Sequence, residues 1–398
     1  MKAESSQVIG KKMGRTEKCV CGSGIKYKKC CKEIGIEVRK LPDNFKAELH
    51  PINKKDLLPI QERAGYFLSH LQKEFQNQAS HLRVRAVNKR MLYRPVEETF
   101  HDFLIFLLKM TLSQEWIDTQ RNTAIQDQHF IFCCFRNYFE WQEKTKNKEE
   151  MAATGRYSGF TDGYTQWLIC LAFDIYCLQH SGHLNSSTLE RLKSSNDQFQ
   201  GARYEITIAA IFARAGFKIE FYNEKDPEVT QKKHCDFIAK DEQSDFRIAV
   251  EAKSRHRAGI MHDQNPLKAE KRYLKGDIHS LLRDAMEKET PQIPYMIFID
   301  LNSPHTPNFI PEEKPWFKDI FVKIGNNTNE RTSGKANLIS ITNFSYHYQE
   351  DTPSTQGEFL NSVARDPHYP IPENIYNRLL DVFRKYGGVP DLDKMFFK

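Results

Sequence analysis

Two acidic residues and a lysine lie in two neighbouring strand-like runs, where they could hold a divalent cation. Glu251 and Lys253 are separated by one residue, so both side chains project from the same face of a strand. Asp236 lies in the preceding run, across the polar turn 241–245 of an expected hairpin. Because paired strands lie about 4.8 Å apart, the carboxylates of Asp236 and Glu251 can converge on one metal ion.

A third carboxylate, Glu205, stands on the helix that precedes these strands. It is aligned with the apolar residues Ala202 and Phe212 at helical spacing. A carboxylate on an otherwise apolar helix face is costly to bury without a partner. We expect that partner to be the metal ion or the ammonium group of Lys253.

The reaction that needs such a set of residues is hydrolysis of a phosphodiester bond. Mg²⁺ or Mn²⁺ would bind the carboxylate oxygens, polarise the phosphate and acidify a bound water. Lys253 would orient or help to deprotonate that water and offset negative charge in the transition state. The alternative is a solvent-facing pair of Glu251 and Lys253 on an edge strand. The E-x-K triplet alone favours that alternative, whereas Asp236, Glu205 and the order of elements favour the metal site.

The elements that would position these residues follow in the order helix, three strands, helix, strand. Apolar periodicity and turn residues place them at 201–215, 217–222, 235–239, 246–253, 277–288 and 295–301. Gly216 closes the first helix, and Asn302, Ser303 and Pro304 stop the last strand. Residues 336–344 could add a strand and residues 372–386 a helix. The sequence therefore predicts an α/β sandwich in this half of the chain.

Residues 199–301 resemble the PD-(D/E)xK nuclease superfamily, especially its Mrr-like and restriction-endonuclease-like branches. The resemblance rests on Phe199-Gln200-Gly201-Ala202-Arg203-Tyr204-Glu205 with Ala213-Arg214-Ala215-Gly216-Phe217, on Cys235-Asp236-Phe237, and on Glu251-Ala252-Lys253. It implies an αβββαβ restriction-endonuclease-like core in which Asp236, Glu251 and the Ala252 carbonyl bind the metal. It assigns Lys253 to the nucleophilic water and Glu205 to metal support. Cys235 stands where the family has a proline, whose side chain is not catalytic.

Four cysteines near the start of the chain have a spacing that suits zinc. Cys19, Cys21, Cys30 and Cys31 form the pattern C-x-C-x8-C-C, and the turn at 22–24 can fold the second pair back onto the first. Structural zinc takes four such ligands at about 2.3 Å. It supplies roughly 10–16 kcal/mol, enough to fold a segment too short to bury a core. The alternatives are a disulfide cluster and free thiols.

The same segment, residues 17–32, closely resembles the SEC-C motif, whose string runs C-P-C-G-S-G-x-K-Y-K-K-C-[CH]. Val20 replaces the proline and Ile25 replaces a frequent lysine, and neither is a ligand. The resemblance implies a structural zinc ion and a docking module for a protein or ribosome partner. It does not imply an activity.

The basic residues of the chain are concentrated in two places. The 398 residues include 58 Lys and Arg and 52 Asp and Glu, with a formal net charge of +6. Residues 1–40 hold eleven Lys and Arg but four Asp and Glu, which indicates an interaction arm, with a solvated tail as the alternative. Five further side chains are expected to contact a nucleic-acid backbone, with a solvated helix face as the alternative: Arg255, Arg257, Lys268, Lys271 and Arg272.

The length predicts several domains. We divide the chain into a basic arm with the zinc module at 1–40, a helical domain at 41–195, the nuclease-like domain at 196–310 and a C-terminal α/β extension at 311–398. Helical periodicity runs over about 57–195, with apolar faces in 100–108 and 167–178 and an aromatic stripe in 130–139. Four cysteines in these faces are expected to be small core residues: Cys133, Cys134, Cys170 and Cys177.

Composition and the absence of targeting signals limit the class of protein. Hydrophobic residues make up 39% and aromatic residues 12%, which excludes wholesale disorder. No apolar run reaches the roughly 18 residues of a membrane helix, and residues 1–16 lack the apolar region of a secretory signal. We therefore expect a cytoplasmic protein with no membrane partner, in a reducing compartment where clustered cysteines bind metal.

The sequence thus predicts a cytoplasmic metal-dependent endonuclease with a zinc module, a helical middle domain and a role in defence or nucleic-acid processing. DNA is favoured over RNA as the substrate only through the family resemblance. Paired cuts in a duplex would suit a homodimer, although no residue pattern demonstrates one. The alternative is a non-catalytic adaptor, docked through its zinc module, whose nuclease-like domain only binds nucleic acid.

Overall fold

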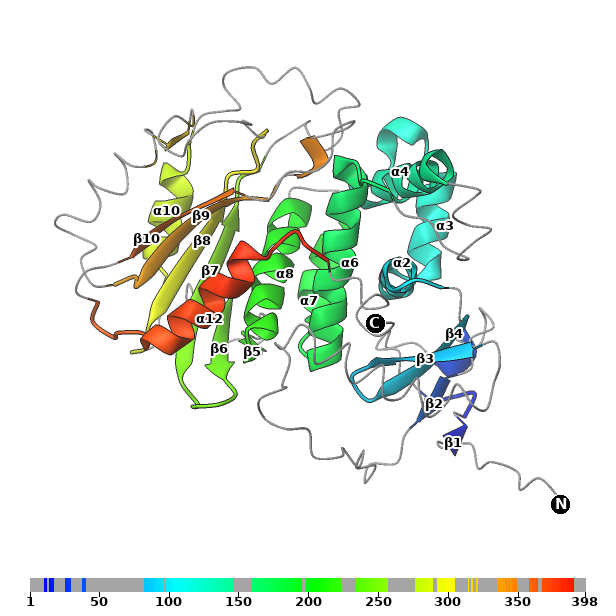
Figure 1. Cartoon of the computed structure of the whole chain (residues 1–398), viewed down its shortest axis with the longest axis horizontal. Coiled ribbons are helices and arrows are strands. Elements are labelled where there is room, and N and C mark those ends of the chain that lie inside the picture. The colour runs from blue at the N-terminus through cyan, green and yellow to red at the C-terminus, as the bar shows by residue number, and fades with distance from the viewer. Residues whose placement is uncertain are drawn as a thin grey trace.

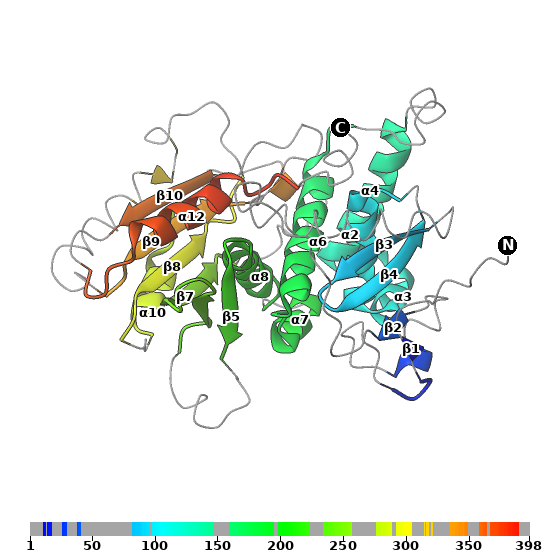
Figure 2. The same ribbon diagram turned by 60° about the horizontal axis from the view of Figure 1, so that its bottom comes forward.

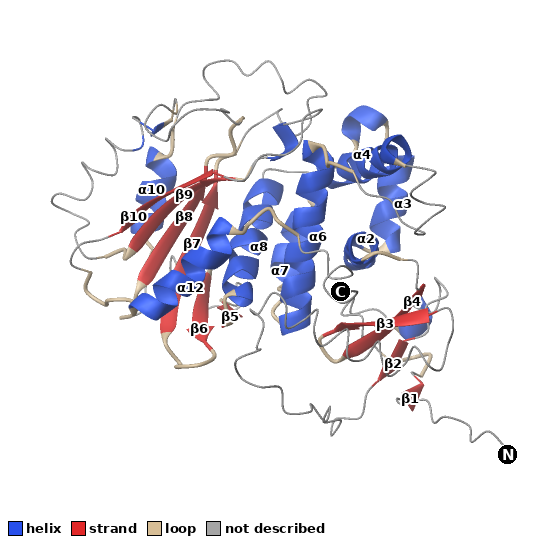
Figure 3. Cartoon of the chain, viewed as in Figure 1, coloured by secondary structure: helices blue, strands red, loops and turns tan. Residues whose placement is uncertain are grey.

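The fold mixes α-helices with two β-sheets (Figure 1). The computed structural model describes residues 11–12, 14–17, 26–29, 38–40, 82–95, 98–146, 159–194, 198–222, 234–256, 276–288, 292–304, 314, 316–317, 320, 335–344, 346–348, 358–363 and 367–389. Within these residues there are eight α-helices, and a group of them lies between the two sheets (Figure 3). No described helix is both long and apolar enough to cross a membrane.

The larger sheet has six strands in the order β10-β9-β8-β7-β6-β5. Its strands are β5 (Phe217–Phe221), β6 (Phe237–Asp241), β7 (Arg247–Ser254), β8 (Tyr295–Asp300), β9 (Leu338–Asn343) and β10 (Glu358–Val363). The first three are antiparallel neighbours, β7, β8 and β9 run parallel, and β10 is antiparallel to β9. The predicted hairpin and the predicted order of helix, three strands, helix and strand are therefore confirmed.

Helices cover both faces of this sheet. One face packs on α8 (Gln198–Arg214) and α12 (Glu373–Arg384), and the other packs on α10 (His279–Met286). Ile248 and Val250 of β7 belong to the first face, whereas Ala249 belongs to the second. Gly216 follows α8 with φ of 86°, a left-handed conformation that favours glycine, and lets the chain turn directly into β5. The alternation predicted for β7 is confirmed.

A layer of helices lies beside α8. It contains α2 (Phe100–Leu112), α3 (Gln114–Asn122), α4 (Phe130–Thr145), α6 (Gly163–Ser181) and α7 (Ser186–Lys193). Thr99 caps α2 by accepting a hydrogen bond from the Asp102 amide at 3.1 Å, and Asp162 caps α6 through the Thr165 amide at 2.7 Å. The apolar faces predicted in 100–108 and 167–178 are buried.

The aromatic stripe of α4 is only partly core. Phe130, Phe135 and Tyr138 are buried as predicted, but Phe139 is 44% exposed. Phe139 is exposed because it lies at the mouth of a cavity between helices rather than inside the layer. Two of the four core cysteines predicted in this layer are buried, Cys134 and Cys170, and the other two are half-buried.

A small four-stranded sheet corrects the helical prediction for 57–195. Its order is β1-β2-β4-β3, with β1 (Lys11–Lys12), β2 (Val38–Lys40), β3 (Leu82–Val87) and β4 (Arg90–Pro95) (Figure 2). The β3–β4 hairpin turns at Asn88, whose φ is 55°. Asparagine tolerates this left-handed conformation, and arginines alternate with apolar residues along β3, so the period is two rather than 3.6.

One hydrophobic core runs through most of the described fold. It extends from β3 and α2 through α6 and α8 to the large sheet and α12. A second, smaller cluster lies under α10 on the other face of the sheet. The core crosses the boundary placed near residue 195, and the division of the chain into four domains stays a prediction.

Candidate metal centre

Asp236, Glu251 and Lys253 lie together at one end of the β6–β7 pair, and we call them the carboxylate–lysine cluster. The two carboxylates come from neighbouring strands: Asp236 directly precedes β6, and its amide donates to the Val250 carbonyl at 3.0 Å. Glu251 is fully buried, whereas Asp236 and Lys253 are half-buried. The cluster therefore has a buried carboxylate at its floor and two partly open side chains above it.

Glu251 uses only one of its two carboxylate oxygens. Its Oε1 lies 2.7 Å from Lys253 Nζ and 3.4 Å from Lys288 Nζ. Its Oε2 is buried and makes no hydrogen bond with any residue that the structure describes. Buried polar atoms are normally satisfied, so an open carboxylate oxygen at this depth indicates a site for a ligand.

Asp236 is held in place by the backbone of the next strand. The Ala252 amide donates a hydrogen bond to Asp236 Oδ2 at 2.7 Å. Within the described part of the chain, no hydrogen bond reaches Asp236 Oδ1. Residues two apart in a strand direct their backbone groups to the same neighbour, so the Ala252 carbonyl faces the Asp236 side, as the Val250 carbonyl does.

Glu205 has a different partner from the one expected. Its carboxylate binds Arg191 Nη2 at 2.6 Å and Thr188 Oγ1 at 2.7 Å, both from α7. Glu205 is thus neutralised by an arginine instead of by Lys253, because α7 packs directly against α8 and brings its basic face to that carboxylate. Arg191 was not predicted from the sequence, because nothing in the sequence of α7 indicates that this arginine faces Glu205.

Burial, and to a smaller extent the charge of Asp236, raises the pKa of both Glu251 and Glu205. Burial raises the pKa of Glu251 to about 7, and the Asp236 charge adds to this while Lys253 and Lys288 oppose it. Burial likewise raises the pKa of Glu205 to about 7, with the Asp236 charge again adding to the effect. Carboxyl groups that repel each other in this way lie within electrostatic range, so Glu205 borders the cluster even though its hydrogen bonds go elsewhere.

Lys253 remains a cation at neutral pH. Burial lowers the pKa of Lys253, but the charges of Asp236 and Glu251 outweigh burial, and the pKa lies above its usual value of 10.5. Cys235, in contrast to Lys253, is uncharged at neutral pH. Burial and the nearby carboxylates of Glu251 and Asp236 raise the pKa of Cys235 to about 12, so the thiol stays protonated and is not a nucleophile.

A second buried network fixes the strand ends beside the cluster. Arg203 of α8 binds Asp300 at 2.8 Å, and Ser254 Oγ donates to the same Asp300 oxygen at 3.3 Å. Both Arg203 and Asp300 are buried. Asn302 extends the network by donating to Gln200 Oε1 at 2.7 Å and to the Arg255 carbonyl at 3.1 Å. These contacts join α8 to the carboxyl ends of β7 and β8. The sequence indicated that Arg203 lies on the helix, but not that it pairs with Asp300.

The two open carboxylate oxygens suit a hard divalent cation. Mg²⁺ is usually bound through one or two carboxylates and retains several waters, and Asp236 with Glu251 supplies that number. A cage of three or more Asp, Glu, His or Cys side chains does not occur among the described residues. The donor set therefore fits Mg²⁺ or Mn²⁺ better than a cation that needs a closed protein cage.

The residues expected to contact nucleic acid are mostly outside the described part of the chain. Arg257, Lys268, Lys271 and Arg272 lie outside it. Arg255 is described and is only 8% exposed, with its amide donating to the Asp300 carbonyl at 3.0 Å. The buried side chain of Arg255 does not fit an exposed phosphate contact, because Arg255 directly follows β7 and its backbone joins the buried network of Asp300 and Asn302.

The predicted zinc ligands Cys19, Cys21, Cys30 and Cys31 also lie outside the described residues. The described residues around them show how the segment is anchored. β1 and β2 pair antiparallel, with Lys11 opposite Lys40, so the cysteine-bearing segment starts and ends on adjacent strands. Tyr27 is buried, and its amide donates to the Glu17 carbonyl at 2.8 Å, which folds the middle of the segment back on its start.

Comparison with known proteins identifies this segment. A family model of the SEC-C motif matches residues 15–33, which confirms the resemblance of residues 17–32 to that motif. No curated protein and no solved structure gives a significant match to the chain. The match is confined to the cysteine-bearing segment, so the interpretation of the carboxylate–lysine cluster rests on its own geometry.

Proposed function

We propose that the chain is a metal-dependent nuclease that hydrolyses phosphodiester bonds in nucleic acid, with DNA as the favoured substrate. The observation that carries the proposal is the fully buried Glu251 carboxylate, whose Oε2 accepts no hydrogen bond from the described residues, next to Asp236 and Lys253. A carboxylate kept only for stability would be expected to have both oxygens satisfied, since an unsatisfied buried polar atom costs about 1–3 kcal/mol.

The order and direction of the elements support a PD-(D/E)xK-type core. α8 is followed by the antiparallel strands β5, β6 and β7, then by α10 and the parallel strand β8. The acidic residues stand at the end of the β6–β7 pair, where Asp236 is half-buried and Glu251 is fully buried. This is the arrangement expected from the resemblance of residues 199–301.

Each residue of the cluster would have a separate role in hydrolysis. Asp236 Oδ1 and Glu251 Oε2 would hold Mg²⁺ or Mn²⁺, together with the Ala252 carbonyl. A cation bound there would polarise the scissile phosphate and lower the pKa of a water ligand. Lys253, held by Glu251 Oε1 at 2.7 Å, keeps its proton and would donate to the attacking water or to a phosphate oxygen.

Three residues outside the cluster would position it. Glu205 would support the metal-bound water from α8 while its own carboxylate is fixed by Arg191. Lys288, at 3.4 Å from Glu251 Oε1, supplies a second positive charge that limits the repulsion between the two carboxylates. Arg203 would hold the end of β8 through Asp300.

The remaining segments would provide substrate and partner binding. The basic residues Arg257, Lys268, Lys271 and Arg272 follow β7 directly in sequence and would contact the phosphate backbone beside the cluster. The SEC-C segment would bind structural zinc and dock a protein or ribosome partner. A cytoplasmic location would suit its clustered cysteines, which bind metal in a reducing compartment.

The test is magnesium-dependent cleavage of supercoiled plasmid and of single-stranded DNA by the full chain. Wild type should cut with Mg²⁺ or Mn²⁺, and Glu251→Gln and Lys253→Ala should each lose about 100-fold or more in rate. Lys240→Ala is the matched control, because Lys240 pairs with Asp245 at the hairpin end of β6, away from the cluster. The proposal fails if wild type is inert on DNA and RNA with both metals, or if both cluster variants cut at the wild-type rate.

One observation favours the alternative, a non-catalytic adaptor. Both oxygens of Glu205 are already engaged by Arg191 and Thr188, which leaves two carboxylates rather than three for metal. An adaptor would bind nucleic acid with the same affinity in Mg²⁺ and in EDTA and would cut none. Gel-shift titrations of wild type under both conditions distinguish the two functions.

A further inference from the structure

A cavity of about 460 Å³ lies between α2, α3 and α4, on the side of α6 away from the six-stranded sheet. Ligand pockets in proteins usually measure about 300–1,000 Å³, so this volume suits a small organic molecule. The cavity is separate from the carboxylate–lysine cluster, and nothing in the nuclease proposal uses it.

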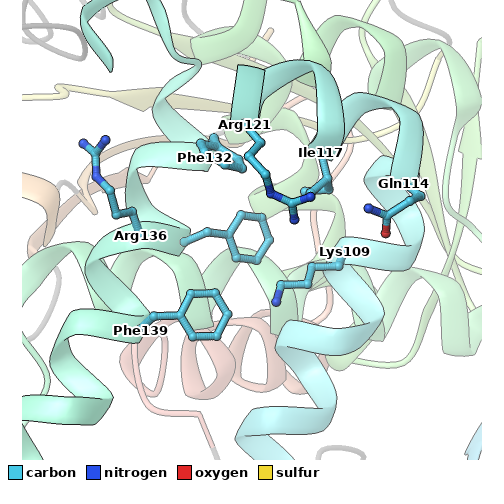
Figure 4. A pocket seen from close by; sticks show the side chains of 8 residues that line it. Lys109, Gln114, Ile117, Arg121, Phe132, Arg136 and Phe139 are labelled. Carbon is cyan, nitrogen blue, oxygen red and sulfur yellow. The ribbon is translucent and has the colours of Figure 1, made fainter. Parts of the chain in front are cut away.

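The cavity combines aromatic and cationic side chains and contains no acid. Three phenylalanines and three cations line most of it: Phe132, Phe135, Phe139, Lys109, Arg121 and Arg136. Figure 4 shows Lys109 from α2 and Arg121 from α3 projecting toward the rings of α4, while Arg136 points away from the centre. The direction of Arg136 agrees with its hydrogen bond from Nη1 to Gln128 Oε1 at 2.9 Å.

Lys109 and Arg121 form a pair of like charges that the described residues hardly compensate. Lys109 makes no hydrogen bond or ion pair with them, and its Nζ lies 4.3 Å from the Phe139 ring centroid. Burial, followed by the Arg121 charge, lowers the pKa of Lys109. Arg121 pairs with Asp118 at 2.7 Å, but both side chains are largely solvated, and such pairs contribute little.

The aromatic part of the cavity is open to solvent. Phe139 is 44% exposed at its mouth, and Phe135 forms its buried floor. Exposed aromatic surface beside Lys109 and the solvated guanidinium of Arg121 is complementary to a planar ring that carries a negative group. A phosphate monoester carries about 1.5 to 2 negative charges at neutral pH, which matches two cations better than a carboxylate does.

We propose that this cavity binds a nucleoside monophosphate group. The base lies on Phe135 and Phe139, and the phosphate lies between Lys109 and Arg121. The same group occurs as a free nucleotide and at the 5′ end of a nucleic-acid strand. Bases stack on aromatic side chains, so rings and cations both contribute to affinity.

The test is calorimetric titration of AMP into the full chain without divalent cations, so that cleavage plays no part. Wild type should bind one AMP, and Lys109→Ala and Arg121→Ala should each weaken binding at least about tenfold. Lys144→Ala is the matched control, because Lys144 is exposed on the same α4 helix but does not line the cavity. Adenosine and inorganic phosphate should each bind at least about tenfold more weakly than AMP.

Three results would overturn the proposal. They are no binding up to about 1 mM AMP, wild-type affinity in both variants, and displacement of AMP by an equal concentration of inorganic phosphate. If Lys109→Ala impairs folding, Arg121→Ala still tests the proposal, because the Arg121 side chain is 64% exposed. Competition with a 5′-phosphorylated tetranucleotide identifies the source: displacement of AMP indicates a strand end, and no displacement indicates a free nucleotide.

Discussion

Replacing Glu251 by glutamine should stabilise the metal-free protein at pH 8, even though it should remove activity. The reason lies in the environment of this side chain, which is fully buried and has one oxygen without a partner among the described residues. Lys253 and Lys288 offset its charge only in part, because burial still raises the pKa of Glu251 to about 7. At pH 8 the folded chain therefore carries a carboxylate that its surroundings disfavour.

The size of the effect follows from the displaced pKa. The folded chain binds this proton more tightly than the unfolded chain does, so the contribution to stability is full below the ordinary pKa of 4.5. It is lost as the pH rises toward about 7. At about 1.4 kcal/mol for each unit, the loss amounts to about 3 kcal/mol by pH 8. Glutamine keeps the shape of the protonated acid and does not ionise, so the variant avoids this loss.

Urea unfolding of the metal-free protein at pH 5 and pH 8 measures the difference. Glu251→Gln should gain about 3 kcal/mol over wild type at pH 8 and less than about 1 kcal/mol at pH 5. Glu220→Gln is the control, since Glu220 lies on β5 of the same sheet with a side chain 37% exposed, and it should change little at either pH. A loss of stability in Glu251→Gln at pH 8 would refute the reasoning, because Glu251 would then be a structural ion-pair partner of the two lysines.

Three further predictions concern other parts of the chain. Arg191→Ala leaves the buried Glu205 charge without its arginine and should destabilise the protein by about 3 kcal/mol at pH 8 but less at pH 5, as urea unfolding at the two pH values will show. Gly387→Ala should lower the free energy of unfolding by about 1–3 kcal/mol, because φ is 93° and the new Cβ would lie 2.2 Å from the Tyr346 hydroxyl oxygen; thermal melting measures this. Reduced protein should contain about one zinc ion per chain, bound by the segment 15–33, and a metal content near zero would exclude the zinc site.

The elements that carry the cluster were predictable because local rules and tertiary packing agree there. β6 and β7 are joined by a polar turn, and residues of β7 alternate between two buried faces, so pairing and register follow from a period of two. Gly216 marks the end of α8 through its positive φ. The positions of Asp236, Glu251 and Lys253 on one face follow directly from that alternation.

The partners of these side chains depended on contacts between elements that sequence periodicity does not specify. Arg191 reaches Glu205 because α7 crosses α8 at that level, and Lys288 reaches Glu251 from the residues after α10. The β3–β4 hairpin was not predicted, because it too depends on contacts between elements. Arg85 is only 2% exposed because its guanidinium lies 5.6 Å from the ring centroids of both Phe100 and Phe103, and this aromatic contact allows a charged residue inside the strand.

Contacts between elements also connect β2, the strand that follows the SEC-C segment in the chain, to the strands that carry the carboxylate–lysine cluster. β2 pairs with β4, and the β3–β4 hairpin binds α6, since the Asn88 amide donates to His180 Nδ1 at 3.3 Å. α6 in turn packs on α8, where Thr207 donates to Asp174 at 3.1 Å, and α8 covers the face of β7 opposite Glu251. A continuous series of contacts among the described elements therefore runs from β2 through β4, α6 and α8 to β7, the strand that carries Glu251 and Lys253.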